Sequence, residues 1–319
     1  MNFPVFDLHC DTALALLGEN LRQAGSMRKN EYHIDLERAS TLPGYAQCFA
    51  CFTTPWEKLP EGTTVTQLFE REMVTVLREV ERNSDLISLA YTAKEIEANL
   101  KNGKMSAILT IEGPAGFGFD PALLEDLYKI GFRITTLGWN EQNVLCGSHK
   151  TGGGLTDLGR EYVFEAQRLG MLIDVSHISD EAFWDIMNIT AGPVIATHSN
   201  SRAVHNVSRN LTDEMFQAIC QTGGVAGLNL YADFLGENAT LDTVCDHVLH
   251  WLELDGAKHI ALGGDLDGCD VLPAGFSGVQ DYPKLAQRLL ARGVNEETVY
   301  DIFWNNAMGV LKNAVCNHS

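Results

Sequence analysis

Positive charge is scarce in this 319-residue sequence. Only 23 lysine and arginine residues stand against 42 aspartate and glutamate residues, which gives a formal net charge of -19. A chain this acidic is repelled by the phosphates of nucleic acids and by anionic membrane surfaces. We therefore expect neither nucleic acid nor a membrane among its partners.

Long apolar segments are also missing. No segment approaches the roughly 20 apolar residues that a membrane-spanning helix needs, and the N-terminus lacks the basic and apolar regions of a secretory signal. The eight cysteines are scattered through apolar segments and do not have the spacing of a disulfide framework. We expect a soluble, cytoplasmic protein with reduced thiols.

Several catalytic and binding motifs are absent as well. No GxGxxG, GxxxxGK[ST] or GxSxG occurs, so dinucleotide binding, P-loop chemistry and serine hydrolysis have no support. Cys48 and Cys51 have the spacing of half a structural zinc site, but no second pair completes it. We interpret them as thiols on opposite faces of a buried strand. The glycine-containing stretches 116–118 and 152–154 are expected to be loops.

The sequence does contain a regular alternation of short apolar segments with longer amphipathic ones. Helical periodicity predicts helices at 64–83, 121–129, 157–169, 180–188, 212–221, 241–254, 281–292 and 296–311. Buried strands are predicted at 3–9, 44–52, 106–112, 132–137, 171–176, 193–198, 223–229 and 259–265. Eight strand–helix units in a chain of this length predict a single (β/α)₈ barrel of the TIM type over residues 1–319.

Histidine and acidic residues recur where the predicted strands end. The first strand ends in His9-x-Asp11, and alternate strand residues share a face, so these two side chains project together. In a barrel the C-terminal ends of all strands meet at the catalytic face, so we expect the residues at those ends to converge. The other such residues are Glu112, His177, His198 and Asp265.

Six nitrogen and oxygen ligands are too many for one tetrahedral zinc ion and suit two ions that share a carboxylate. We predict that His9 and Asp11 hold one zinc ion and that His177 and His198 hold the other. Glu112, which enters from a different strand, is placed to bridge the two ions. A single histidine is more often a core residue, so the cluster as a whole supports this prediction.

Asp265 ends the last predicted strand and is placed to act as a general acid and base beside the metals. Asp267 would share its face, so the spacing leaves the choice between these two residues open. We interpret the histidines outside the ligand set as surface or structural residues. His149 and His205 are the two of them that could support the ligands from behind.

In these residues the sequence resembles the renal (membrane) dipeptidase family of zinc metallopeptidases, and in particular its bacterial-type members. The resemblance runs nearly end to end, and it implies a (β/α)₈ barrel with two zinc ions that hydrolyses dipeptides, often with a D-residue on the C-terminal side. Six blocks carry it in order: DLHCD at 7–11, IEG at 111–113, LGMLIDVSH at 169–177, THSNS at 197–201, SRNLTD at 208–213 and GGDLDG at 263–268.

The resemblance also implies roles for single residues. It implies the ligand set predicted above, with Glu112 as the bridge, Asp265 as the proton shuttle and Arg209 as the clamp for the substrate's C-terminal carboxylate. A guanidinium can grip a carboxylate through two parallel hydrogen bonds, which suits a free C-terminus. Trp139 stands where mammalian members have a histidine that contacts the substrate carbonyl. An indole can donate a hydrogen bond but cannot transfer a proton, so Asn140 or an exposed metal could stabilise the oxyanion.

The expected reaction is attack on the peptide bond of a dipeptide by a hydroxide that two zinc ions share. Two alternatives remain open: another metal-dependent amidohydrolase, or a barrel that binds metals without turnover. Many barrel amidohydrolases use His-x-His and a carbamylated lysine, whereas this sequence has His-x-Asp with Glu112 as the bridge. The complete ligand set together with Asp265 favours catalysis. A homodimer is a candidate assembly.

Overall fold

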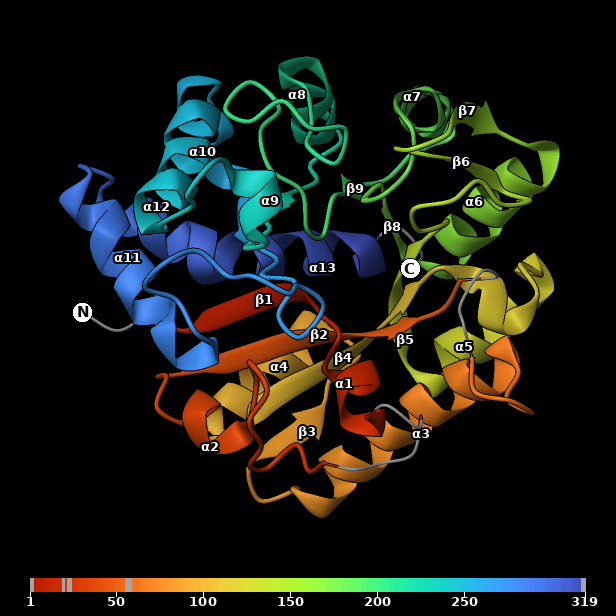
Figure 1. The fold of residues 1–319 in the computed structure, drawn as a ribbon, viewed down its shortest axis with the longest axis horizontal. Coiled ribbons are helices and arrows are strands. Elements are labelled where there is room, and N and C mark those ends of the chain that lie inside the picture. Colours follow the sequence, from red (N-terminus) through yellow and green to blue (C-terminus); the bar gives the residue numbers. More distant parts are fainter. Residues whose placement is uncertain (1–2, 19–20, 22–24, 55–58, 317–319) are drawn as a thin grey trace.

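The centre of the fold is a ring of parallel strands that follow one another around a barrel in chain order (Figure 1). The structure is a computed structural model that describes residues 3–18, 21, 25–54 and 59–316. The strands are rich in apolar side chains because both of their faces are buried. They are β1 (Val5–Cys10), β2 (Tyr45–Phe52), β4 (Met105–Glu112), β5 (Phe132–Thr136), β8 (Leu172–Asp174), β9 (Val194–Ile195), β10 (Ala226–Leu228) and β11 (Ile260–Leu262).

The ring closes between β9 and β10. Ala196, directly after β9, forms a parallel bridge with Ala226. The N–H of Ala196 donates to the carbonyl of Val225 at 3.0 Å, and the N–H of Gly227 donates to the carbonyl of Ala196 at 2.7 Å. The predicted (β/α)₈ barrel is therefore confirmed.

Helices connect the strands, and several begin directly after a capping residue. Thr212 and Ser179 each accept a backbone N–H of the first helical turn, which satisfies a donor that the helix leaves free. None of the described helices is long and apolar enough to cross a membrane. They are α1 (Thr12–Leu17), α2 (Leu36–Ala39), α3 (Val65–Arg82), α4 (Ala93–Lys101), α5 (Leu124–Ile130), α6 (Asp157–Leu169), α7 (Asp180–Ile189), α8 (Asp213–Gln221), α9 (Ala232–Leu235), α10 (Leu241–Glu253), α11 (Tyr282–Ala291), α12 (Glu296–Tyr300) and α13 (Asn306–Cys316).

Some elements differ from the predictions. The expected helix 296–311 is divided into α12, a π-helical turn (Asp301–Asn305) and α13. A short strand, β3 (Ile87–Leu89), pairs with β4 outside the barrel ring. The described residues also form four short 3₁₀ helices: Pro114–Phe117, Pro121–Leu123, Gly256–Lys258 and Val279–Asp281.

The loop predictions for the two glycine-containing stretches are wrong except at Gly118, which lies in a turn. Residues 116 and 117 belong to the 3₁₀ helix that begins with Pro114, and proline is well suited to the start of a helix. Gly152–Leu155 forms β7, which pairs with β6 (Cys146–Ser148) in an antiparallel hairpin. A Cβ at Gly147 would lie 1.8 Å from the carbonyl oxygen of Gly152, so only glycine permits this close pairing.

Alternation along the strands separates the inside of the barrel from its helix-covered outside. On β4, Ile108 belongs to a buried cluster that takes side chains from, or next to, all eight barrel strands, whereas Leu109 belongs to the outer core. Glu112 lies an even number of residues from Ile108 and so faces inward at the C-terminal end of its strand. Cys48 and Cys51 belong to these two different clusters, as predicted, and both are free thiols.

An irregularity in β1 turns His9 to the inner side of the barrel. The pairing with β2 shifts register between Asp7 and Cys10, so β1 has one extra residue there, as in a β-bulge. Cys10 packs in the outer core, whereas His9 and Asp11 lie with their side chains 3.5 Å apart. The bulge thus re-aims His9 toward the mouth of the barrel.

The N-terminal ends of the strands are covered by the end of the described chain. Helix α13 contacts β1, β11 and α4 (Figure 1). Trp304, Met308 and Leu311 belong to the same buried cluster as Phe6 and other inward strand residues. The C-terminal ends of the strands therefore form the open face of the barrel.

Candidate metal centre

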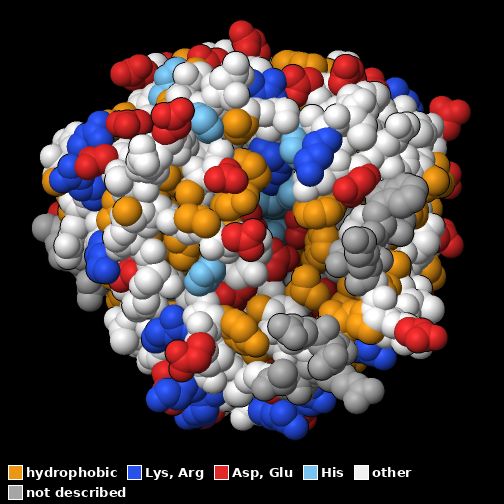
Figure 2. All heavy atoms as spheres, in the orientation of Figure 1, with side chains coloured by type: hydrophobic (Ala, Val, Ile, Leu, Met, Phe, Trp, Pro, Cys, Tyr) orange, Lys and Arg blue, Asp and Glu red, His pale blue; other side chains and the backbone are white. Residues whose placement is uncertain are grey.

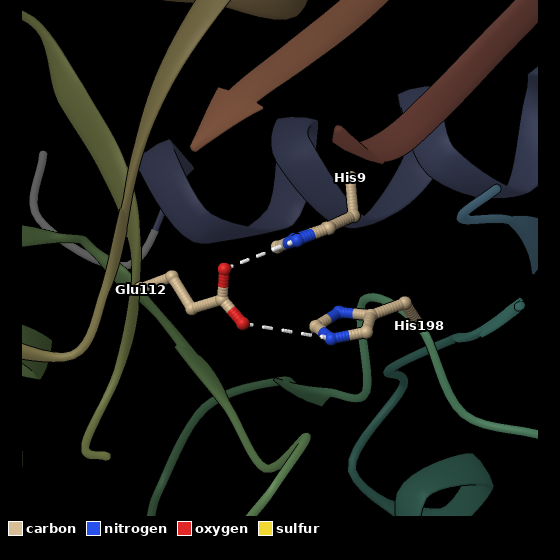
Figure 3. Close-up of side chains that lie close together, drawn as sticks. All are labelled: His9, Glu112 and His198. Atoms are coloured by element: carbon tan, nitrogen blue, oxygen red, sulfur yellow. Dashed lines mark ion pairs between the residues drawn. The ribbon is translucent and has the colours of Figure 1, made fainter. Parts of the chain in front are cut away.

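Glu112 lies in the middle of the site and turns one carboxylate oxygen to each side (Figure 3). Its Oε2 is 3.3 Å from Nε2 of His9. Its Oε1 is 3.0 Å from Nε2 of His177 and 3.8 Å from Nε2 of His198. A carboxylate in this position can contact two cations at once.

The carboxylates of Asp11 and Asp265 complete the side nearest His9. The Nε2 of His9 is 3.5 Å from Oδ2 of Asp11 and 3.8 Å from Oδ1 of Asp265. Two triads have ligand atoms within 4.8 Å of one another, His9–Glu112–His198 and His9–Asp11–Asp265. The structure therefore brings all six residues from the strand ends together, each of them at most 9% exposed.

His177 and His198 approach each other in a way that leaves two lone pairs face to face. Their Nε2 atoms are 2.8 Å apart. Nδ1 of His177 is 3.0 Å from Oδ1 of Asn140, which only accepts. Nδ1 of His198 is 2.7 Å from Oγ1 of Thr197, whose own proton goes to Asp174. Both imidazole protons thus lie on Nδ1, and the facing Nε2 lone pairs repel each other unless a cation binds them.

The charge states of the site fit the same conclusion. Burial, with the positive charge of Arg209, lowers the pKa of His177 and His198 well below the usual value, so both rings are neutral. At His9 burial is outweighed by the carboxylates of Glu112 and Asp11, which raise the pKa, so this side of the site attracts positive charge. Neutral imidazole is the form that binds metals. Among the described residues, Nε2 of His9 and Oδ1 of Asp11 are buried without a hydrogen-bond partner, which is costly. These nitrogen and oxygen atoms are therefore suited to bind metal ions.

Polar residues that were not predicted from the sequence lie behind the ligands and fix the orientation of the ligands. The Asp174 carboxylate accepts hydroxyl protons from Thr136 and Thr197, at 2.7 and 2.6 Å. The buried Asn229 donates from Nδ2 to Oδ2 of Asp265 at 2.9 Å. Such partners hold the tautomer and direction of a ligating or catalytic group. In the sequence, the one sign of such supporting residues is an acidic or hydroxyl side chain inside an otherwise apolar strand segment.

Backbone strain gathers at the mouth of the barrel. His177, Asp265 and Asp267 have φ values of 72, 55 and 70°, in the left-handed region that non-glycine residues rarely adopt. Such a conformation costs on the order of 1–3 kcal/mol and often marks a functional position. It turns the chain sharply after β8 and β11.

Asp265 and Asp267, which the sequence leaves as alternatives, have different surroundings. One Asp267 oxygen accepts from Oγ1 of Thr12 and the other from the N–H of His33, both at 2.6 Å. Asp267 therefore anchors the segment between β1 and β2, and His33 is structural. Asp265 instead faces His9, and burial raises its pKa to about 6. This placement favours Asp265 as the proton-transferring residue.

A cavity of about 320 Å³ opens above the ligands. Figure 2 shows a hollow on this face, with histidine and acidic side chains inside it and hydrophobic side chains at its rim. The Trp139 and Phe52 rings pack edge to face at 5.1 Å, as do the Tyr231 and Phe234 rings at 4.8 Å. These four residues and Asn140 line the cavity, together with Asp11, Leu14, Glu112, His177, Asp265, Asp267 and Gly268.

Arg209 lies beside the cavity and does not line it. It is 4% exposed, and its guanidinium donates to Oγ of Ser199 and to the carbonyl of His198, both at 3.2 Å. The guanidinium lies 5.3 Å from the Phe234 ring centre. Its Nε has no hydrogen-bond partner among the described residues.

The chain is similar to known proteins in sequence and in fold. The family described as membrane dipeptidase (peptidase family M19) matches residues 1–318. The chain belongs to this family. The predicted resemblance to membrane dipeptidases is thus confirmed. An uncharacterized dipeptidase from Schizosaccharomyces pombe is 32% identical over 265 residues, which are 81% of this chain but only 64% of that protein.

Two solved structures are similar in fold over almost the entire chain. One is a metallo peptidase from Rhodobacter sphaeroides liganded with a phosphinate mimic of the dipeptide L-Ala-D-Ala, with a TM-score of 0.88 and 26% identity, covering 98% of this chain and 100% of that one. The other is the M19 dipeptidase AC, with a TM-score of 0.87 and 28% identity, covering 98% and 99%.

Gly268 offers a direct test of the ligand geometry. A Cβ at this position would lie 2.0 Å from Oδ2 of Asp11 and 2.6 Å from Oδ1 of Asp265, so Gly268→Ala must displace both carboxylates. We expect zinc affinity, measured by titration of the metal-free protein, to fall about 10–100-fold, as when ligand positioning is disturbed. Gly309→Ala is the control, because a Cβ there meets nothing within 4 Å. Unchanged affinity in Gly268→Ala would contradict the ligand assignment.

Proposed function

We propose that this protein is a binuclear zinc dipeptidase that hydrolyses dipeptides, including those with a C-terminal D-residue. The observation that carries the proposal is the buried group of facing imidazole lone pairs and carboxylates around Glu112. His9 and Asp11 would hold one ion, His177 and His198 the other, and Glu112 would bridge them. Mixed imidazole and carboxylate ligands suit zinc. Two bound zinc ions would polarise the peptide carbonyl and make water a stronger nucleophile.

The residues of the chain supply the proton transfer. Asp265 lies at the floor of the cavity, held by Asn229 on one oxygen and facing His9 with the other. From there it can take a proton from the attacking water and deliver it to the leaving amine. Trp139 and Asn140 form the wall where the substrate carbonyl would lie. Their side chains can form hydrogen bonds with the carbonyl but cannot transfer a proton to it.

The cavity favours a small, zwitterionic substrate. Its volume of about 320 Å³ lies near the lower end of the range for small-molecule sites, which suits a dipeptide better than a longer peptide. Aspartates on its lining attract a free amino group, while Arg209, buried beside Phe234, would bind the C-terminal carboxylate. The L-Ala-D-Ala mimic bound by the Rhodobacter sphaeroides relative supports a D-residue at the C-terminal position.

Asp265→Asn tests the proposed reaction. The amide keeps the size of the carboxylate and can still accept from Asn229, but it cannot carry a proton. We expect kcat for L-Ala-D-Ala and L-Ala-L-Ala to fall about 10²–10⁴-fold, with two zinc equivalents retained. Asp270→Asn, at an exposed residue, is the control. Wild-type kcat in the Asp265 variant would remove the residue from this role, and a zinc-loaded wild-type protein that cleaves no dipeptide would refute the proposed function.

The role of Arg209 can be tested with substrates that differ only at the C-terminus. If its guanidinium binds the carboxylate, kcat/KM should be at least about 30-fold lower for C-terminally amidated dipeptides, equivalent to roughly 2 kcal/mol. In Arg209→Lys this preference should shrink, because an ammonium cannot form the paired hydrogen bonds. Arg168→Lys, which alters an ion pair with Glu165 on α6, should preserve it. Equal hydrolysis of free and amidated dipeptides by the wild-type protein would exclude the clamp.

A further inference from the structure

The tip of the β6–β7 hairpin lies against the segment that carries His177. The N–H of His149 donates to the carbonyl of His177 at 2.8 Å. Ser148 forms an antiparallel bridge with Ile178, and the N–H of Ser179 donates to the carbonyl of Gly147 at 3.2 Å. These contacts help to hold His177 in its left-handed conformation, with φ of 72°.

Side chains of the same tip also hold Asn140. Its Oδ1 lies 3.0 Å from Nδ1 of His177 and 2.8 Å from Nε2 of His149. Its backbone carbonyl accepts from Oγ of Ser148 at 2.6 Å. The side-chain oxygen of Asn140 thus accepts from two imidazoles, so its NH₂ group is the part of the side chain that could serve the oxyanion role considered from the sequence.

The imidazole of His149 helps to keep the direction of the Asn140 amide. If the amide rotated by half a turn, its NH₂ group would face Nδ1 of His177 and would require the ring proton to move to Nε2. That proton would block the lone pair that faces the metal site. In the present direction Nε2 of His149 donates to Oδ1 of Asn140, so the rotation would also require the His149 proton to move to Nδ1. Both rings would have to change tautomer together, which opposes the rotation.

The other side of the His149 ring reaches the segment that contains Arg209. Nδ1 of His149 is 2.8 Å from Oγ of Ser208, which donates because Nε2 carries the ring proton. A continuous chain of hydrogen bonds therefore runs from Ser208 through His149 and Asn140 to His177. In the described part of the chain, His205, the other candidate support, forms no hydrogen bond with a predicted ligand.

We propose that His149 is a positioning residue for the half of the metal centre formed by His177 and His198. It locks Asn140, and Asn140 in turn fixes the tautomer and the direction of the His177 ring. The inference rests on the proposed binuclear site and extends it to the hairpin. Partners of this kind typically change metal affinity 10–100-fold when removed.

The test is a zinc titration of the metal-free protein that resolves two sites. In His149→Leu, one site should weaken by about 10–100-fold while the other keeps its wild-type affinity. General damage to the fold would not produce such a selective loss. His149→Gln should restore the weakened site, because its amide can donate to Asn140 and accept from Ser208. The control is His250→Leu, which removes a partly buried histidine that is hydrogen-bonded to Asp213. This variant should bind both zinc equivalents with wild-type affinity.

The possible outcomes separate this inference from the proposed function. A wild-type protein that binds fewer than two equivalents would refute the binuclear site, and the inference with it. If the wild-type protein binds two zinc equivalents and His149→Leu binds both with unchanged affinity, the role of His149 is refuted while the binuclear site stands. If circular dichroism shows that His149→Leu does not fold, Ser208→Ala decides. A selective weakening of one site supports the role of His149, and unchanged affinities overturn it.

Discussion

The crowding of buried negative charge and lone pairs at the mouth of the barrel is the constraint on which the structure depends. Two imidazole Nε2 atoms meet at 2.8 Å, and the carboxylates of Asp11, Glu112 and Asp265 lie around His9 within 3.8 Å. Without cations the two facing lone pairs repel each other, and so do the three carboxylates, in surroundings that screen charge poorly. The bulge in β1 and the left-handed turns after β8 and β11 are local costs that place the groups there.

Much of the fold and the site could be predicted, because both follow from simple periodicities. Alternating strands and helices indicate the barrel, and a barrel collects its strand ends on one face. That reasoning brings Glu112, His177 and His198 together although they lie far apart in sequence. Asp265 was also expected there, but its choice over Asp267 needed the contacts of Asp267 with Thr12 and His33.

The supporting residues could not be predicted, because their roles depend on contacts between distant segments. Asp174 and Thr197 become a pair only when β8 and β9 lie side by side. His149 reaches Asn140 only because glycines allow β6 and β7 to pair closely, and a run of glycines in the sequence suggests a loop instead. The position of Arg209 beside the cavity likewise depends on how its segment packs against Phe234.

Anomalous diffraction at the zinc edge, from crystals grown with excess zinc, tests the central claim most directly. We predict two peaks about 3.5–4 Å apart, as in other two-metal sites, one beside His9 and Asp11 and the other beside His177 and His198, with Glu112 between them. A single peak, or peaks away from these side chains, would contradict the account.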